Sequence, residues 1–494
     1  MLKRWLRRFH STRQVLHHYV LRTRTRERDI VKKLLTHTYK HTQTKANLKN
    51  NMNQSSRRQF LITTGAVAAG TVLLHGCSTG PSKSGGESSV SSTATPAANA
   101  TVANAPKVET NTVKLGFIAL TDSAPLIVAV EKGFFAKYGM TDVKVEKQAS
   151  WPVTRDNLVL GSAGNGIDGA HILSPMPYLM ALGKITQGKP LPMYILARLN
   201  TNGQAISVSN AYKEVKLAKD SSKVKDLFAK AKAANKQLKV AVTFPGGNHD
   251  LWMRYWLAAG GINPDGDISV VPVPPPQMVA NMKVGNMEAF CVGEPWNAQL
   301  VNQKAGYTAL LTGELWPDHP EKAFAMRADW VDKNPNAAKA ILMGVLEAQQ
   351  WCDKDENKAE MIKIVSQAKW FKVPEADIIE RAKGNIDYGD GRTEKNYPYK
   401  MKFWANNASY PYKSHDLWFL TEDMRWGYLP PNTDTKKIID QVNREDLWKE
   451  AAKAIGVTEI PASTSRGVET FFDGVKFDPE KPAEYLKSLK IKKV

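Results

Sequence analysis

Short apolar runs alternate with segments of helical periodicity along most of the chain after residue 112. The runs are rich in β-branched and aromatic residues and are bounded by Gly, Pro or polar residues, which is typical of buried strands. They lie at 113–120, 143–148, 166–172, 192–199, 240–244, 268–273 and 287–292. Segments of helical periodicity lie at 126–137, 154–160, 178–182, 224–234, 251–259 and 277–283. This alternation predicts an α/β fold with mostly parallel sheets.

Several predicted strands end in a polar or proline-containing cluster that leads directly into a helix, at 122–123, 174–175, 245–247 and 274–277. Ligands of open α/β sheets bind beyond the carboxyl ends of the strands. If these ends converge, the chain presents a cleft whose floor is made of helix N-termini, which suits a small anion. The segments 150–152 and 200–204 are predicted loops.

The stretch 239–261 shows this arrangement most clearly, with a buried strand, a Pro-Gly-Gly turn and a helix that a Gly-Gly pair ends. Asn248 or Asp250 is the predicted helix cap. Glycines before a helix N-terminus let a ligand approach free backbone N–H groups, and His249 lies in the turn. The alternative reading is an ordinary tight turn with His249 as a surface capping residue. From this stretch alone both readings stay open.

Beyond residue 319 the pattern predicts a short strand at 323–327, a long helix at 336–352 and helices near 435–442 and 444–455. From about residue 385 the chain is rich in loops and in aromatic residues, namely Trp404, Tyr410, Tyr412, Trp418 and Trp426. No polar cluster accompanies these rings. We therefore expect them to cover and stiffen the fold rather than to form a ligand platform.

The N-terminal segment has the order of an export signal. A twin-arginine pattern at 56–61 precedes a moderately apolar run at 62–74 and the tetrapeptide Leu74 to Cys77. The tetrapeptide resembles a bacterial lipobox, although His75 departs from its commonest residues, and it predicts lipidation of Cys77. Residues 52–77 are thus the predicted signal, and 78–112 a flexible tether rich in Ser, Gly, Thr, Ala and Pro. The basic leader 1–51 is either a mis-assigned start upstream of Met52 or an unusually long charged region.

The formal charge of +20 at first suggests a nucleic-acid partner. The leader holds 14 Lys and Arg against Glu27 and Asp29, a net +12, and Arg57 with Arg58 adds +2. Only +6 remains for the chain from Cys77 onward, so the folded part is mildly basic and we expect no nucleic-acid partner.

No catalytic or metal-binding pattern is present. The sequence lacks G-x-S-x-G, Walker A, H-E-x-x-H and CxxC motifs. Cys291 and Cys352 lack metal-ligand spacing and are expected to be ordinary thiols. His171 is expected to be a buried structural histidine. These observations predict a protein that is not an enzyme and that has no metal and no cofactor.

Five stretches carry a resemblance to a known family: 113–139, 242–262, 274–300, 319–327 and 467–479. They include the Gly-Gly-Asn-His turn at 246–249 and the Gly-Glu-Pro-Trp motif at 293–296. With these residues the chain resembles the solute-binding lipoproteins of bacterial ABC importers for nitrate, with bicarbonate-binding proteins as close relatives.

The resemblance implies a two-lobed periplasmic-binding-protein fold, type II like, with the ligand cleft between the lobes and hinge closure on the ligand. It implies lobe 1 at 113–205 and 320–494, including a C-terminal extension, and lobe 2 at 206–319. The implied partners are nitrate or nitrite, a permease with its ATPase, and the inner membrane reached through a lipid anchor, with the globular part on the periplasmic side.

The resemblance also implies an oxyanion pocket that contains Trp151, Gln204, Gly247, His249 and Lys322. Nitrate is planar, monovalent and weakly hydrated, so it needs an aromatic plane, a few donors and one positive charge. Trp151 offers an indole donor or a stacking face, Gln204 an amide donor and Lys322 the charge. Lys283 is the alternative source of that charge, and a solvated surface lysine is the alternative reading of Lys322.

Three other functions stay open. Bicarbonate-binding relatives are expected to carry an acidic residue near the lysine position and to use calcium as a co-ligand. An anion sensor that reports to a membrane partner would share every feature of the importer subunit. An enzyme like the thiamin-pyrimidine synthases would share the fold, but those enzymes are not exported.

Overall fold

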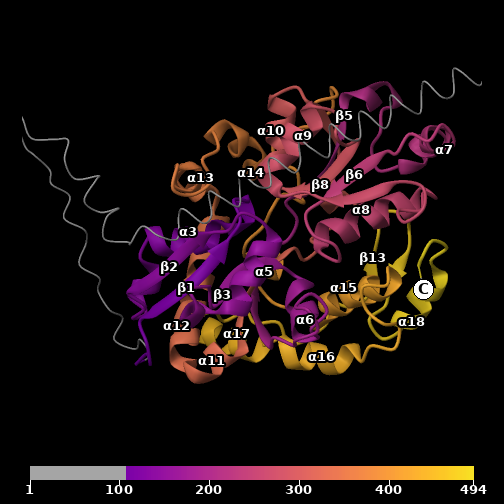
Figure 1. Ribbon diagram of the computed structural model, residues 1–494. Coiled ribbons are helices and arrows are strands. Elements are labelled where there is room, and N and C mark those ends of the chain that lie inside the picture. The colour runs from indigo at the N-terminus through magenta and orange to yellow at the C-terminus, as the bar shows by residue number, and fades with distance from the viewer. Residues whose placement is uncertain (1–106, 494) are drawn as a thin grey trace, which may run out of the picture. The chain divides into compact units, whose positions relative to one another are not determined.

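The computed structural model describes residues 107–493, which contain two five-stranded mixed sheets surrounded by helices (Figure 1). This confirms the predicted two-lobed α/β architecture. Residues 1–106, with the signal, Cys77 and most of the tether, lie outside the described part of the chain. Within that part, no helix is long and apolar enough to span a bilayer.

The first sheet has the order β2-β1-β3-β10-β4. It is made of β1 (Thr112–Phe117), β2 (Asp142–Lys147), β3 (Gly169–Leu173), β4 (Met193–Arg198) and β10 (Lys322–Arg327). Strands β1, β2 and β3 are parallel, whereas β10 runs antiparallel to both β3 and β4.

The second sheet has the order β7-β6-β8-β5-β9. Its strands are β5 (Gln204–Ser209), β6 (Lys239–Val242), β7 (Ser269–Pro272), β8 (Ala289–Gly293) and β9 (Gly306–Leu311). Here β5 is the antiparallel strand, between β8 and β9. Each sheet is therefore mostly parallel, as predicted, but has one antiparallel strand that the sequence pattern did not indicate.

The antiparallel strands arise where the chain crosses between the sheets. The chain leaves β4 and enters β5 through residues 199–203, and it returns from β9 to β10 through 312–321. These two crossings run side by side. The N–H of Leu199 donates to the carbonyl of Lys322 at 2.7 Å, and the N–H of Asn202 donates to that of His319 at 3.1 Å. Two adjacent crossings of this kind form a hinge between the sheets.

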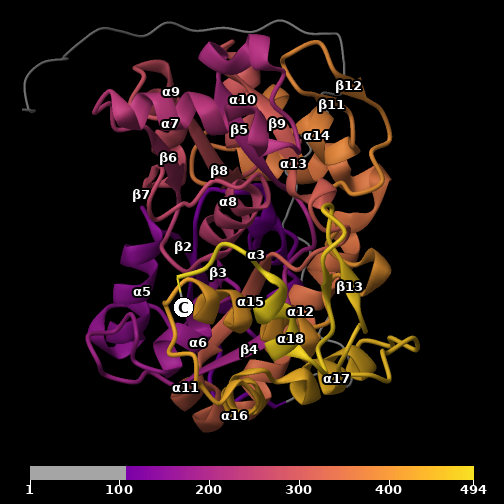
Figure 2. The ribbon, with the colours of Figure 1, turned by 90° about the vertical axis from the view of Figure 1, so that its right-hand side faces the viewer.

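Helices cover both sheets (Figures 1 and 2). Around the first sheet lie α3 (Ala124–Glu131), α4 (Phe134–Lys137), α5 (Trp151–Leu160), α6 (Met176–Ala181), α11 (Ala328–Lys333) and α12 (Pro335–Asp353). Around the second lie α7 (Lys225–Ala233), α8 (Asn248–Ala259), α9 (Met278–Lys283) and α10 (Trp296–Asn302). The predicted helix 126–137 is divided into α3 and α4 because Gly133 adopts a positive φ of 72°.

The C-terminal third packs against both sheets. It contains α13 (Lys358–Ser366), α14 (Ile379–Lys383), α15 (Lys413–Arg425), α16 (Thr435–Val442), α17 (Glu445–Ala454) and α18 (Pro482–Ser488), with the short pairs β11-β12 and β13-β14. Helix α17 contacts β4, whereas α15 contacts α8. Trp418 of α15 stacks on Trp252 of α8 with ring centroids 4.8 Å apart. Trp418 and Trp426 are fully buried, so they stiffen the fold as expected and offer no open platform.

Candidate functional site

The residues that were predicted to form the pocket lie at the beginnings of separate elements near the hinge. Trp151 begins α5, Gln204 begins β5, His249 is in the first turn of α8, and Lys322 begins β10. The structure therefore corrects two local predictions, because Trp151 and Gln204 lie in regular elements rather than in loops. Each of these four side chains is at most 1% exposed.

Lys322 is at the centre of the charged part of this site. Its ammonium group lies 2.8 Å from Oε1 of Glu321 and 3.1 Å from Oδ2 of Asp122, and all three side chains are fully buried. The reading of Lys322 as a solvated surface lysine is therefore wrong. Lys283 is exposed at the end of α9, so the structure also removes the alternative that Lys283 supplies the buried charge.

A hydrogen-bonded chain connects Lys322 to the second sheet. The amide of Gln204 donates to Oδ2 of Asp122 at 2.9 Å, and its oxygen lies 2.7 Å from Nε2 of His249. Nδ1 of His249 lies 2.5 Å from the hydroxyl of Thr243 at the end of β6. Since Gln204 Oε1 can only accept, Nε2 of His249 carries a proton and donates to it. His249 is thus a buried member of the network and not a surface cap.

Asp122 has three donors around one planar carboxylate. Besides Lys322 and Gln204, Nε2 of His171 approaches Oδ1 at 2.5 Å. Burial opposes ionisation of Asp122, but the charge of Lys322 and the hydrogen bond from His171 hold its pKa below the ordinary range. His171 is buried as predicted, yet it belongs to the polar site rather than to an apolar core.

Trp151 closes one side of the site, and its indole N–H lacks a hydrogen-bond partner within the described chain. Its ring packs against that of His171 with centroids 5.4 Å apart. Its indole N–H is buried and has no partner within the described chain. A buried indole N–H usually has an acceptor, so this group is a free donor beside the network.

The glycine turn differs in detail from its prediction. Gly247 is the N-cap of α8 and has an ordinary φ of −90°, whereas Gly246 carries the positive φ of 70°. A side chain at Gly247 would meet Cδ1 of Leu173 at 2.5 Å. Glycine is therefore required at 247 because the two lobes approach closely there. The ordinary φ of this residue would itself allow a side chain.

Neither predicted helix cap performs that role. Asn248 is already inside α8, where its oxygen accepts from the N–H of Ser174 at 2.9 Å and its amide donates to the carbonyl of Glu321 at 2.8 Å. Asp250 accepts from the N–H of Gly246 at 2.9 Å. Asn248 thus joins the second sheet to the first sheet and to the hinge.

Glu321 is the second carboxylate of the site. It accepts from Nε1 of Trp252 at 3.0 Å and lies 3.5 Å from Nδ1 of His319. Burial raises the pKa of Glu321, although Lys322 opposes this effect. Burial lowers the pKa of His319 to about 3, so this imidazole is neutral near pH 7. With neutral histidines, Lys322 faces Asp122 and Glu321 together.

The sequence reasoning missed the two carboxylates that hold Lys322. Asp122 was part of a predicted strand-end cluster, and Glu321 is adjacent to Lys322 in the stretch 319–327, so both carried a positional signal.

In the described residues there is no cluster of three or more His, Cys, Asp or Glu that could hold a metal ion. Cys291 and Cys352 are buried free thiols, as expected.

The two linked sheets and the buried polar site at their hinge define a two-lobed binding-protein fold. Residues 106–366 match the NMT1-like family, and the chain belongs to this family. The chain is 70% identical over 445 residues to the nitrate/nitrite binding protein NrtA of Nostoc sp., which covers 90% of this chain and 100% of the relative.

Among solved structures, the chain is similar to the periplasmic nitrate-binding protein NrtA from Synechocystis. The TM-score is 0.76 at 65% identity, and the match covers 78% of this chain and 100% of that one. The bicarbonate-binding protein CmpA of Synechococcus elongatus is 47% identical over 455 residues, 90% of this chain and 100% of the relative. The nitrate import ATP-binding protein NrtC of Synechocystis sp. is 35% identical over 379 residues, 76% of this chain and 55% of that relative.

Proposed function

We propose that this protein binds nitrate or nitrite on the periplasmic side of the inner membrane and delivers the anion to the permease and ATPase of an ABC importer. It does so as a binding protein and not as an enzyme. The relative with 70% identity is described as a nitrate/nitrite binding protein. A nitrate import ATP-binding protein is also related to this chain.

The observation that carries the proposal is the set of donors around the Asp122 carboxylate. Lys322, Gln204 and His171 each approach one of its oxygens within 3.1 Å. A carboxylate and a nitrate ion are both planar and present oxygens in one plane, so donors arranged for one also suit the other. The free indole N–H of Trp151 adds a further donor beside them.

The bound anion would have to compete with Asp122 for these donors. In the structure the ammonium of Lys322 is already shared by Asp122 and Glu321. We propose that opening at the two crossings, 199–203 and 312–321, separates lobe 1 (113–205 and 320–494) from lobe 2 (206–319). Gln204 would then exchange its contact with Asp122, and His249 its contact with Gln204, for a contact with the ligand, together with Trp151, Gly247 and Lys322.

Bicarbonate with calcium is the second candidate, since the bicarbonate-binding relative also covers the whole site. A calcium ion takes six or more oxygen ligands, several of them from carboxylates. Both buried carboxylates here, Asp122 and Glu321, contact the ammonium of Lys322 instead. The lysine therefore favours nitrate or nitrite over a calcium-dependent ligand.

Membrane attachment is a proposal from the sequence alone. A twin-arginine signal at 52–77 would export the chain, and lipidation of Cys77 would leave the globular part on the tether 78–112. Cys77→Ala should then move the mature protein from the membrane to the soluble periplasmic fraction. Detergent partitioning measures this, and unchanged partitioning would contradict the anchor.

The proposed function is tested by calorimetric titration of the purified protein with nitrate, nitrite, sulfate, and bicarbonate with and without calcium. We expect saturable binding of nitrate or nitrite at one site that involves Lys322, and weaker binding of the tetrahedral sulfate. Lys322→Met should weaken nitrate binding by about one to two decades, because a charge-assisted hydrogen bond contributes about 1.5–3 kcal/mol. Lys283→Met is the matched control on an exposed lysine. Binding of bicarbonate only with calcium, and none of nitrate, would overturn the proposal.

A further inference from the structure

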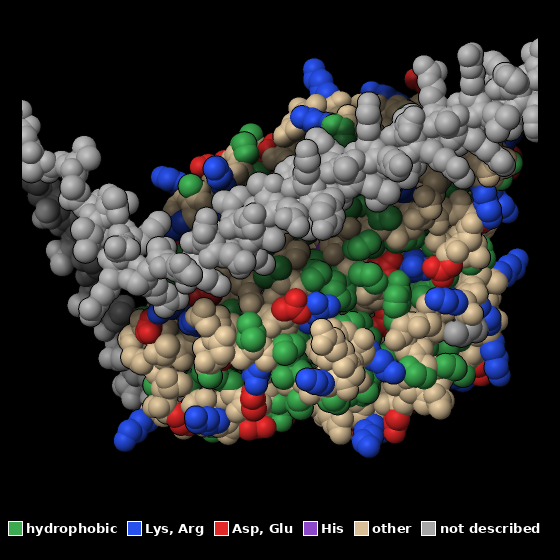
Figure 3. Space-filling view, in the orientation of Figure 1, with side chains coloured by type: hydrophobic (Ala, Val, Ile, Leu, Met, Phe, Trp, Pro, Cys, Tyr) green, Lys and Arg blue, Asp and Glu red, His purple; other side chains and the backbone are tan. Residues whose placement is uncertain are grey.

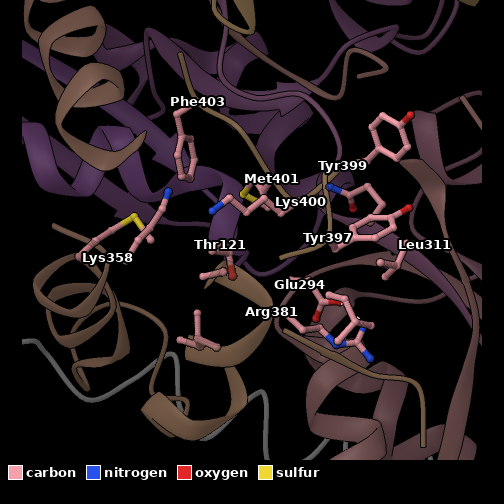
Figure 4. Close-up of a pocket in the computed structure, with 16 residues that line it drawn as sticks. Thr121, Glu294, Leu311, Lys358, Arg381, Tyr397, Tyr399, Lys400, Met401 and Phe403 are labelled. Carbon is pink, nitrogen blue, oxygen red and sulfur yellow. Dashed lines mark hydrogen bonds and ion pairs between the residues drawn. The ribbon is translucent and has the colours of Figure 1, made fainter. Parts of the chain in front are cut away.

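A cavity lies beside the hinge (Figure 4), and its lining includes none of Trp151, His249 and Lys322. Its volume is about 30 Å³, and it is walled by the hinge, by α13 and α14, and by the C-terminal segment 397–403. A space of this size holds about two water-sized groups or one small ion, and it is too small for a metabolite.

Lys358 is the unusual side chain of this cavity. It is 1% exposed, and within residues 107–493 its ammonium group makes one hydrogen bond, to the carbonyl oxygen of Cys352 at 2.7 Å. No carboxylate of the described residues lies within 4 Å of its ammonium group. Buried charges are almost always paired, because an isolated ion loses its hydration without compensation. Lys358 therefore has no carboxylate in direct contact among the described residues, and Asp353 and Asp355 act on it only from a greater distance.

The amino group of a second lysine, Lys400, lies near that of Lys358 and adds positive charge to this region. Figure 4 shows the amino groups of Lys358 and Lys400 pointing into the same space near the ring of Phe403. The ammonium of Lys358 lies 5.2 Å from that ring centre. Burial lowers the pKa of Lys358; the charge of Asp353 opposes this effect, whereas the charge of Lys400 adds to it. The partner of Lys400 is Asp355, which is 76% exposed and outside the cavity wall.

The other charged groups of the wall balance each other. Arg381 pairs with Glu294 at 2.7 Å and also donates to Thr308 at 2.7 Å. The hydroxyl of Thr121 lines the cavity, is buried and has no partner within the described chain. The cavity wall thus presents two ammonium groups and two buried hydroxyls, those of Thr121 and Tyr397, that have no partner within the described chain.

We infer that this cavity is a second binding site for a small inorganic anion, held by Lys358, Lys400 and Thr121. One monovalent anion would accept hydrogen bonds from the two ammonium groups and from Thr121, and it would fill a space of this size. This site would be distinct from the pocket around Lys322. The two sites share a wall, since Thr121 precedes Asp122 and Gln204 borders the cavity as well.

Bromide is a suitable probe because its anomalous X-ray scattering locates it directly. Crystals of the protein grown with sodium bromide should show an anomalous peak between Lys358 and Lys400, and Lys358→Met should lose it. A peak in the Lys322 pocket with none in the cavity would overturn this inference alone. A peak in the cavity with none in the Lys322 pocket would support it while contradicting the proposed pocket.

A solution measurement guards against binding at crystal concentration only. In a Lys322→Met background, nitrate should still raise the melting temperature relative to sodium gluconate at equal ionic strength, because gluconate is too large for the cavity. Adding Lys358→Met should weaken that apparent affinity about tenfold. Lys363→Met, on the exposed side of the same helix, is the control and should change nothing. Equal responses with and without Lys358 would overturn the inference.

Discussion

Lys322 and Lys358 are both almost fully removed from water, but their surroundings differ. Lys322 is 0% exposed and contacts two buried carboxylates, Asp122 and Glu321. Lys358 is 1% exposed and contacts a backbone carbonyl, an aromatic ring and an open cavity. The ammonium of Lys322 is paired with carboxylates of the protein, so an anion must compete with them for it. The ammonium of Lys358 has no carboxylate in contact, so an anion could bind to it without displacing one.

Because of this difference, removing each lysine should affect stability and anion binding differently. A buried ion pair is costly to break, because the partner that remains is an unpaired charge in a medium of low dielectric constant. A buried lysine without a carboxylate leaves no such partner when it is removed. Removal of Lys322 should therefore cost much more stability than removal of Lys358, whereas each removal should weaken anion binding at its own site.

The largest effect is expected for Lys322→Ala. It leaves Asp122 and Glu321 buried without their counter-charge, and breaking such a pair costs about 3–5 kcal/mol of unfolding free energy. Urea denaturation of the protein measures the change in unfolding free energy. Lys283→Ala, on the protein surface, should stay within about 0.5 kcal/mol of the parent. A loss below about 1 kcal/mol at Lys322 would show that the carboxylates find other partners.

A steric change at the glycine turn should have the next largest effect. Gly247→Ala forces Leu173 to move, since the new Cβ would lie 2.5 Å from its Cδ1, and overpacking of this kind costs about 1–3 kcal/mol. It should also weaken nitrate binding, because the two sheets could no longer close at this contact. Thermal unfolding and nitrate titration of the variant measure both effects. An unchanged affinity would remove this turn from the pocket.

The pH dependence of stability should report the neutral buried histidines of the Lys322 site. His319 has a folded pKa of about 3, below its ordinary value of 6.5, so folding favours the neutral imidazole. The unfolding free energy should therefore rise with pH between about 3 and 6.5. The contribution of His319 to stability should decrease as the pH falls through this range. Between pH 5 and 7 this histidine alone contributes about 2 kcal/mol. His319→Gln should flatten the profile in denaturation experiments at several pH values, and an unchanged slope would contradict a neutral His319.

The smallest effect is expected for Lys358→Met. The variant loses one hydrogen bond to the carbonyl of Cys352 but leaves no buried carboxylate unpaired. The unfolding free energy should change by less than about 1 kcal/mol in buffer without small anions. Lys363→Met is the control. A loss as large as that of Lys322→Ala would mean that Lys358 is already paired, and the contrast between the two lysines would fail.

The order of strands and helices was predictable because periodicity is local. The run 240–244 and the helix after it appear at nearly their predicted positions as β6 and α8. Strand β5 was not predicted, since Gln204–Ser209 follows a polar segment and its character depends on its neighbours β8 and β9. The antiparallel direction of β5 and β10 follows from the two crossings, which only the folded chain brings together.

The members of the candidate site were predicted from family resemblance, whereas their partners were not. Lys322 appears in the sequence as one lysine among many. Its burial follows from the pairing of β10 with β3 and β4, strands that lie far away in sequence. Asp122 and His171 meet Lys322 for the same reason. The local pattern around each residue could not show that Lys283, at the end of helix α9, is exposed and that Lys322, at the start of β10, is buried.

The distribution of surface charge on one face of the molecule can be compared with the charge count of the sequence. Figure 3 shows Lys and Arg side chains interspersed with Asp and Glu over the visible face, and no single basic surface gathers there. The excess charge of the chain resides mainly in residues 1–51, as counting the sequence already indicated. The described part therefore lacks, on this face, the continuous basic surface that nucleic-acid binding requires.

Nitrate titration of Trp151→Phe tests the central claim most directly. This substitution keeps an aromatic ring against His171 and removes only the indole N–H, which is buried and has no partner in the described chain. If that N–H is a ligand donor, nitrate affinity measured by calorimetry should fall about three- to tenfold, the value of one hydrogen bond, while the melting temperature stays near that of the parent. Equal nitrate affinity in Trp151→Phe and the parent would contradict the assignment of the anion to this pocket.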